Sequence, residues 1–412
     1  MKLKLIIILL FAVIITPSFA AKKKTFALSK RVHSMLQDVN TLFEQDDYLN
    51  ANIELDTMLK RKLSPYEKAQ IWYMKGNAYY QLNKLPQSAD AFEKVVYDPD
   101  NIPELLRQGT LRTLTQLNLG LDRIEKATRF AEQLLLETSQ PEIDYALYAQ
   151  ILYRADHFND AAVAIEQSVI AYQNKGKIPK ENTLLLQNAI YFSQQKNRQM
   201  LIPLEMLIKH YPKPTYLLYL ASVYGQLGDT EKQTVLMETL YEDNQLKKSS
   251  QFINLASLYM SENVPVKGAV VLTKAMADNI VEKNKRNLEL LSQAWLMAAE
   301  YDDAIATLGK AAKLSDNGNL YLRQAYLLYD RFKWQLANSA IDNALDKGFE
   351  EQNKIGESQL LKAMVLFNLE QFDQAIKACQ KAAQYQKTKK LAGQWINYIS
   401  SEQQKFIKLS EF

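Results

Sequence analysis

A helix-hairpin signature recurs ten times along this chain, at intervals of about 32 to 40 residues. It is clearest in residues 72–80, which read WYMKGNAYY, and it is clear again in residues 301–306 and 372–377. A single hairpin cannot bury its apolar face alone, so a repeat of this length predicts a stack in which each hairpin covers its neighbour. We therefore expect a solenoid, an architecture that presents an extended surface for binding.

Small residues recur at two places in the hairpins. The position that opens the second helix holds Ala51, Ser88, Ala127, Ala161, Leu201, Gln233, Ala269, Ala304, Ala337 and Ala375. Twelve residues earlier, in the first helix, stand Val39, Gly76, Thr115, Ala149, Ala189, Ala221, Ser257, Ser292, Ala325 and Ala363. Small residues that face each other let paired helices approach closely, and large apolar residues at i, i+3 and i+4 fill the space around them. The fit is loose in the fifth and sixth repeats, where Leu201 and Gln233 replace the small residue.

This pattern resembles the tetratricopeptide repeat (TPR) family from about residue 30 to about residue 387. The resemblance implies an all-α fold, a right-handed α-solenoid of about ten TPR helix hairpins spanning residues 31–388. Past the tenth hairpin, seven residues recur at the spacing that places side chains on one face of a helix: Leu391, Trp395, Tyr398, Ile399, Glu402, Phe406 and Leu409. Residues 389–412 are expected to form a helix that caps the last repeat, because the end of a solenoid cannot be left bare. The alternative is a helix that docks a partner.

The N-terminus predicts export. Lys2 and Lys4 precede an apolar run over residues 5–15, and Ser18 to Ala20 supply a small-x-small cleavage site, so residues 1–20 are expected to be a signal peptide. The expected location is the periplasm, and an uncleaved inner-membrane anchor is the alternative. Residues 21–30 form a basic tail. It could touch an anionic membrane surface, or it could be a solvated lead into the first helix.

Nothing in the sequence predicts an enzyme. The three histidines, His33, His157 and His210, fall in different repeats, and Cys379 is the one cysteine, so metal-ligand spacing and an internal disulfide are both absent from the sequence. Acidic pairs such as Asp302 and Asp303 fall at hairpin turns, where aspartate caps helices. We expect no cofactor, no small-molecule substrate and no nucleic-acid partner, since lysine and arginine are spread among the acids.

The TPR resemblance implies that the first helix of each hairpin lines a concave groove. Carried over to this chain, the groove residues are Tyr73, Asn77, Tyr80, Gln81, Gln150, Tyr153, Arg154, Leu322, Tyr326, Tyr329, Asp330, Leu360, Met364, Phe367 and Asn368. This surface is rich in tyrosine and side-chain amides, a composition found in protein interfaces. The alternative is that several of the tyrosines pack against neighbouring helices. The family's carboxylate clamp is not expected, because Leu36 and Tyr73 stand where that clamp has lysine.

Taken together, the chain is similar in architecture to the periplasmic TPR proteins that accompany TonB–ExbB–ExbD systems in marine gamma-proteobacteria. The resemblance implies a non-enzymatic accessory of TonB-dependent uptake that binds envelope proteins, with TonB or ExbD as the candidate partner. The alternative is a scaffold for the assembly of outer-membrane proteins, pili or polysaccharide-export machinery.

Overall fold

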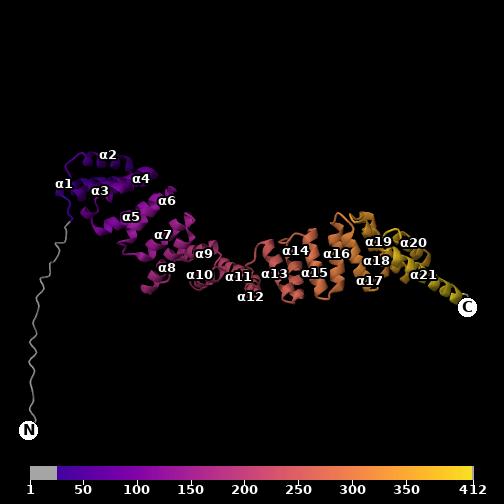
Figure 1. The fold of residues 1–412 in the computed structure, drawn as a ribbon. Coiled ribbons are helices and arrows are strands. Elements are labelled where there is room, and N and C mark those ends of the chain that lie inside the picture. Colours follow the sequence, from indigo (N-terminus) through magenta and orange to yellow (C-terminus); the bar gives the residue numbers. More distant parts are fainter. Residues whose placement is uncertain (1–25, 411–412) are drawn as a thin grey trace, which may run out of the picture. The chain divides into compact units, whose positions relative to one another are not determined.

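The computed structural model describes residues 26–410. Those residues form 21 α-helices and one short 3-10 segment, Pro99–Asn101, with no strand among them. The expected signal peptide, residues 21–25 of the expected basic tail and residues 411–412 of the expected capping helix lie outside the described part of the chain. The chain divides into two compact units, residues 1–199 (unit 1) and residues 200–412 (unit 2), each of which is a row of helices in chain order (Figure 1).

The helices of unit 1 are α1 (Lys30–Glu44), α2 (Tyr48–Leu59), α3 (Pro65–Gln81), α4 (Leu85–Val95), α5 (Glu104–Gly120), α6 (Ile124–Leu135), α7 (Pro141–Arg154), α8 (Phe158–Asn174) and α9 (Glu181–Ser193). The division between the units falls inside α10 (Asn197–His210). Unit 2 continues with α11 (Pro214–Gln226), α12 (Thr230–Glu242), α13 (Ser249–Ser261), α14 (Pro265–Ala277), α15 (Lys285–Met297), α16 (Tyr301–Lys313), α17 (Asn319–Asp330), α18 (Trp334–Lys347), α19 (Gln352–Asn368), α20 (Phe372–Ala382) and α21 (Lys389–Ser410).

Packing within each unit follows the chain. Each helix from α1 to α9 packs against the next one in that row, and so does each helix from α11 to α21. The first helices of successive hairpins also touch, as α5 does α7, α7 does α9 and α13 does α15. Neighbour-only contact is the property that defines a helical solenoid. The predicted all-α fold of stacked helix hairpins is confirmed.

Each of the ten hairpins turns on one residue with a left-handed backbone. These residues are Asp46, Asn83, Asp122, Asp156, Gln195, Gly228, Asn263, Ala299, Phe332 and Glu370. The amide of the following residue donates to a carbonyl five residues back, as Lys84 N does to Tyr79 O at 2.8 Å and Lys333 N does to Leu328 O at 2.9 Å. This is the hydrogen bond that closes a helix C-terminus when the next residue turns left-handed. One backbone geometry therefore sets all ten turns.

Counting from the turn residue shows where the small residues belong. The close-packed positions lie seven residues before and five residues after it, as Gly76 and Ser88 do around Asn83. In that pair the Ser88 hydroxyl donates to the Gly76 carbonyl at 2.8 Å. In eight of the ten hairpins, the residue pair predicted from the sequence lies at these two positions. The sixth hairpin is one of the eight, although the large Gln233 occupies its second position.

The expected register is wrong by one residue in the other two repeats. In the seventh, the positions fall on Ala256 and Gly268, and a Cβ on Gly268 would lie 2.8 Å from the Ala256 carbonyl oxygen. Ser257 is instead exposed and bonds back to Ile253 O. In the fifth repeat the second position falls on Met200, which is buried, and not on Leu201. In the seventh repeat, small residues at both neighbouring positions hide the register, and only the turn fixes it.

One buried carboxylate, that of Glu67, ties the first two hairpins of unit 1 together. Both Glu67 oxygens accept hydrogen bonds: Oε1 from the amide and hydroxyl of Ser29, at 3.0 and 2.7 Å, and Oε2 from the amide of Ser64 at 2.8 Å. Because Ser29 and Ser64 are the N-caps of α1 and α3, a single carboxylate serves two helix N-termini. Residues 26–29, placed in the basic tail from sequence, are thus held against the second hairpin, and the Phe26 ring packs on Tyr66.

Helix α21 lies against the last hairpin. Ile399 is fully buried with Leu366 and Cys379, and Trp395 packs on the Phe367 ring at 6.0 Å between ring centroids. Further along α21, Phe406 contacts Phe372. The first half of α21 therefore covers the apolar side of α19 and α20, which is the place expected for a capping helix.

Candidate protein-binding groove

The predicted groove residues differ in exposure. The prediction is wrong for Leu322 and Leu360, which are buried in the core and cannot line an open groove. Tyr80, Gln81, Gln150 and Tyr326 are exposed on their first helices, Tyr80 to 54% and Tyr326 to 42%. Asn77 and Met364 are half-buried. Tyr73, Tyr153, Tyr329 and Phe367 are also half-buried, and each of them packs against an aromatic ring of the second helix of its own hairpin.

Three of those aromatic contacts share one geometry. The first ring lies three residues before the left-handed turn residue and the second ring lies two residues after it, as with Tyr153 and Phe158 at 5.6 Å, Tyr329 and Trp334 at 5.0 Å, and Phe367 and Phe372 at 5.9 Å between centroids. Phe43 and Tyr48 make the same contact in the first hairpin. Tilted and edge-on rings at this separation stabilise the turn. These aromatic side chains pack within their own hairpins and offer little surface to a partner. Among the predicted groove residues, Tyr80, Gln81, Gln150 and Tyr326 therefore have the most exposed surface for binding.

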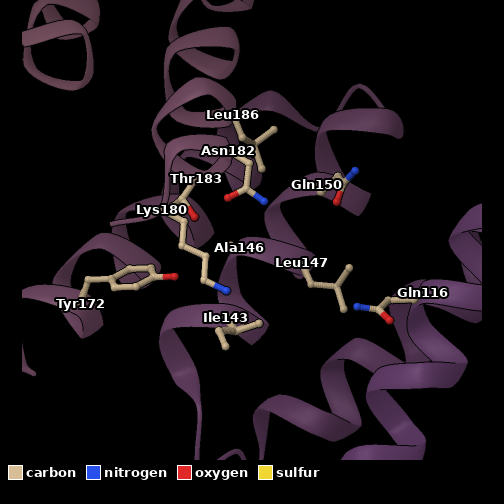
Figure 2. Close-up of a pocket in the computed structure, with 10 residues that line it drawn as sticks. All are labelled: Gln116, Ile143, Ala146, Leu147, Gln150, Tyr172, Lys180, Asn182, Thr183 and Leu186. Carbon is tan, nitrogen blue, oxygen red and sulfur yellow. The ribbon is translucent and has the colours of Figure 1, made fainter. Parts of the chain in front are cut away.

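Gln150 takes part in a pocket between the first helices of three successive hairpins of unit 1. The pocket has a volume of about 250 Å³ (Figure 2). Its lining comes from α5, α7, α8, α9 and the loop before α9, and consists of Gln116, Ile143, Ala146, Leu147, Gln150, Tyr172, Lys180, Asn182, Thr183 and Leu186. Ligand sites for drug-sized molecules usually begin at about 300 Å³. A space of this size fits one side chain of a bound segment.

The helices around the pocket are held in place by ion pairs. Arg112 of α5 makes two bonds to the buried Asp144 of α7, at 2.6 and 2.8 Å. Planar two-point contacts of this kind fix both distance and angle between the elements that carry them. Lys175, the C-cap of α8, bonds to Glu142 of α7 at 2.6 Å, and the hydroxyl of Ser168 on α8 donates to the Glu142 carbonyl. The pocket walls on α5, α7 and α8 are therefore fixed relative to one another.

Burial, hydrogen bonds and charge together set the pKa of Glu142. Burial alone would raise the pKa of Glu142, but the bond from Lys175 and the nearby Lys177 charge bring it below its ordinary value. Glu142 is thus ionised and paired at neutral pH, and it does not titrate as an acid–base catalyst would.

The surface of the pocket combines an apolar floor with polar edges. Ile143, Leu147 and Leu186 are half-buried and supply the floor, while Gln116, Gln150 and Asn182 are exposed and carry side-chain amides. Amides can both donate and accept, so they match the backbone of an extended segment. The buried Tyr172 closes one side (Figure 2).

Sequence reasoning found Gln150 and missed the rest of this lining. Lys180, Asn182 and Thr183 belong to the fifth repeat, where the expected register is one residue off, and Lys180 lies in the loop between repeats. Pro179 was a usable signal, because a proline between two hairpins marks the loop that leads into the next helix, and Lys180 is the N-cap of α9.

Residues 26–410 contain no cluster of three or more His, Cys, Asp or Glu side chains able to hold a metal ion. No helix of that part of the chain has both the length and the apolar composition needed to cross a bilayer. Burial raises the pKa of the Cys379 thiol to about 11, so this cysteine carries almost no reactive thiolate at neutral pH.

Comparison with known proteins gives a family match for one part of the chain. Residues 37–103 match the sequence model of the Tetratricopeptide repeat family, and this stretch covers most of the first two hairpins. A search of curated proteins gives no match.

Several solved structures are similar to larger parts of the chain. A tetratricopeptide repeat protein from Parabacteroides merdae is 12% identical, with 75% of this chain and 99% of that chain covered and a TM-score of 0.38. The C-terminal part of a TPR repeat-containing protein from Cytophaga hutchinsonii is 13% identical, with 68% and 95% covered and a TM-score of 0.41. A structure of Naa15/Naa10 bound to HypK-THB is 13% identical, with 90% and 65% covered and a TM-score of 0.42.

Proposed function

Because the family match and the helix-hairpin fold support a tetratricopeptide-repeat protein, we propose that this chain is a non-enzymatic scaffold that binds a segment of another protein. The observation that carries the proposal is the pocket at Gln150, where three first helices of unit 1 form an apolar floor with amide edges. The binding site is the face of α5, α7 and α9 around this pocket.

The composition of this face supports a peptide rather than a small molecule. Bound peptides need acceptors and donors for their backbone and a place for one or two side chains, and this face offers both. Gln116, Gln150 and Asn182 supply such donors and acceptors at the edge of the pocket.

The finer part of the proposal concerns place and partner. The chain is proposed to be exported to the periplasm by residues 1–20 and to serve a TonB-dependent uptake system, with TonB or ExbD as the segment donor. The support is the sequence of the N-terminus, with its basic start, apolar run and small-x-small site. Assembly of outer-membrane proteins, pili or polysaccharide export is the competing assignment, and it predicts a different captured protein.

A pair of variants with the same chemical change tests the groove. Gln150→Arg places a bulky charge at the pocket, whereas Gln133→Arg places it on an exposed site of α6, outside the pocket lining. The tagged chain 21–412 would be used to capture proteins from an envelope extract, with quantitative mass spectrometry as the readout. We expect wild type and Gln133→Arg to capture the same partner, and Gln150→Arg to capture at least about tenfold less, which corresponds to about 1.4 kcal/mol.

Equal capture by all three proteins would remove the groove as the binding site. Purified periplasmic domains of TonB and ExbD, titrated against wild type, address the finer assignment. Binding that Gln150→Arg weakens supports this assignment. A titration up to about 1 mM detects complexes with a binding free energy of only about 4 kcal/mol. If no binding occurs at that concentration, the assignment to TonB or ExbD is wrong. Circular dichroism of each variant verifies the fold.

A further inference from the structure

The pocket at Gln150 contains one cation without a counter-ion. Lys180 is exposed in the loop between α8 and α9, and its ammonium group makes no ion pair or hydrogen bond with any described residue. In Figure 2 the side chain extends from this loop over the pocket, with its nitrogen between Tyr172 and Ile143 in the view. The neighbouring Lys175, by contrast, is paired with Glu142. The Lys180 ammonium group therefore takes no part in the ion pairs and hydrogen bonds that stabilise the described part of the chain.

A hydroxyl of the same pocket also has no hydrogen-bond partner among the described residues. Thr183 is 4% exposed and lines the pocket, and its side-chain oxygen has no hydrogen bond within residues 26–410. Its backbone amide bonds to the Lys180 carbonyl at 3.0 Å, which fixes the two residues on the same turn. A hydroxyl can both donate and accept, so Thr183 is available to a ligand's polar group at the pocket surface.

The carboxylates close to Lys180 in the chain and across the pocket are already engaged. Glu142 is bonded to Lys175, and Asp144 is bonded to Arg112 and to the Thr138 hydroxyl. Glu181 makes interactions of its own. The charge that faces the pocket is therefore positive.

We propose that this pocket selects a segment with an acidic side chain beside an aliphatic one. The aliphatic side chain packs on Ile143, Leu147 and Leu186, and the carboxylate accepts hydrogen bonds from the Lys180 ammonium and the Thr183 hydroxyl. The proposal rests on the proposed function, because it names the chemistry of the segment that the same groove binds. Charge complementarity of this kind sets partner choice more than total affinity.

Defined peptide pools test the selection. Each pool has a leucine at one fixed position, a second fixed residue one to three positions away, and a mixture of Gly, Ser, Ala and Asn elsewhere, with both ends blocked. The second fixed residue is Asp or Glu in the acid pool and Asn or Gln in the amide pool. Fluorescence anisotropy with chain 21–412 in about 0.1 M salt measures binding, since the Debye length there is about 10 Å. We expect the acid pool to bind about five- to tenfold more tightly, a difference on the order of 1 kcal/mol.

Two lysine variants provide the control. Lys180→Glu should abolish or reverse the preference for the acid pool, whereas Lys177→Glu, in the same loop but outside the pocket lining, should keep it. Lys180→Met should bind both pools alike. Equal binding of both pools by wild type, or the same loss in both glutamate variants, would overturn the inference. A further pool has a free C-terminal carboxylate and no acidic side chain. If it binds more tightly than the acid pool, the bound carboxylate comes from a chain terminus, and the proposal of an acidic side chain is wrong.

The experiment separates this inference from the proposed function. If wild type captures an envelope protein through Gln150 but binds the acid and amide pools equally, or binds neither, the selection is wrong while the groove remains a binding site. If Gln150→Arg captures as well as wild type and no pool binds, both proposals fail.

Discussion

The Ser292 hydroxyl donates a hydrogen bond of 2.8 Å to the carbonyl oxygen of Ala304, across the hairpin that α15 and α16 form. Ser88 and Gly76 make the same contact, with the donor on the opposite helix. The serine side chain is short, so its hydroxyl reaches the backbone of the next helix at this length only where the two helices approach closely. The two helices of a hairpin therefore approach each other most closely at the small positions of the repeat.

Enlarging one of these positions should destabilise the hairpin. Ala304 is fully buried, so Ala304→Leu is expected to lower the free energy of unfolding by about 1–3 kcal/mol, because the added atoms force the helices apart. Ala306→Leu, on the exposed side of the same helix, is the matched control and should change it by less than about 0.5 kcal/mol. Urea unfolding followed by far-ultraviolet circular dichroism measures both. A loss in Ala306→Leu equal to that in Ala304→Leu would contradict the assignment.

Two glycines in unit 1 should respond to alanine in opposite ways. A Cβ on Gly76 would lie 2.8 Å from the ring of the buried Phe92, whereas a Cβ on Gly109 meets nothing within 4 Å. Gly109→Ala should stabilise α5 by about 0.5–1 kcal/mol, since alanine is the better helix former. Gly76→Ala should destabilise the second hairpin despite the same gain in helix propensity. Thermal unfolding of the two single variants, scanned side by side, checks the sign of each change.

Acid should weaken the link between the first two hairpins. Burial alone would raise the pKa of Glu67, but the hydrogen bonds from Ser29 and Ser64 lower it to about 2 in the folded chain. A carboxyl with a lowered folded pKa contributes its stability above its unfolded pKa, near 4.5, and loses it as the pH falls from there to about 2. Glu67→Gln should cost about 1–3 kcal/mol at pH 7 and remove this part of the acid dependence.

The matched control for Glu67 is Glu54→Gln on the exposed face of α2. Its unfolding between pH 7 and pH 2 should follow that of wild type. An unchanged acid dependence in Glu67→Gln would show that the two N-caps do not depend on this carboxylate.

A glycine at a hairpin turn should stabilise the protein. Ala299 is exposed and has φ 59°, a left-handed backbone that costs an L-residue about 1–2 kcal/mol and glycine much less. Ala299→Gly is expected to raise the free energy of unfolding by up to about 1 kcal/mol. The same substitution inside the helix, Ala306→Gly, should lower it by about 1 kcal/mol. If both variants lose stability, the turn does not carry this strain.

The single cysteine reports on α21. Cys379 is buried beside Ile399 and its raised pKa makes it unreactive, so wild type should react slowly with a thiol reagent at pH 7. Removing residues 389–412 exposes this part of α20 and should raise the labelling rate at least about tenfold, because the thiol becomes accessible and its pKa falls toward the ordinary value. Cys379→Ser supplies the background. Equal rates with and without α21 would mean that the helix does not cover the last repeat.

The sequence by itself determined the number of hairpins and most of their register. Small residues at two places per repeat and proline at the starts of α3, α7, α11 and α14 are local signals, because close approach and helix initiation depend on a few neighbouring residues. The register in the fifth and seventh repeats was not determined in this way. In the seventh, Ala256, Ser257, Gly268 and Ala269 are all small, and the left-handed turn at Asn263 decides which of them meet.

The tertiary structure alone decided which groove residues remain available. Tyr153 and Tyr80 occupy the same place in their hairpins, three residues before the turn. Tyr153 packs on Phe158, while Tyr80 stays exposed because Leu85 offers no ring at the matching position. The pocket at Gln150 likewise joins Lys180 and Gln116, which lie in different repeats of the chain. Residues so distant meet only when successive hairpins stack, since stacking brings the first helices of three repeats onto one face.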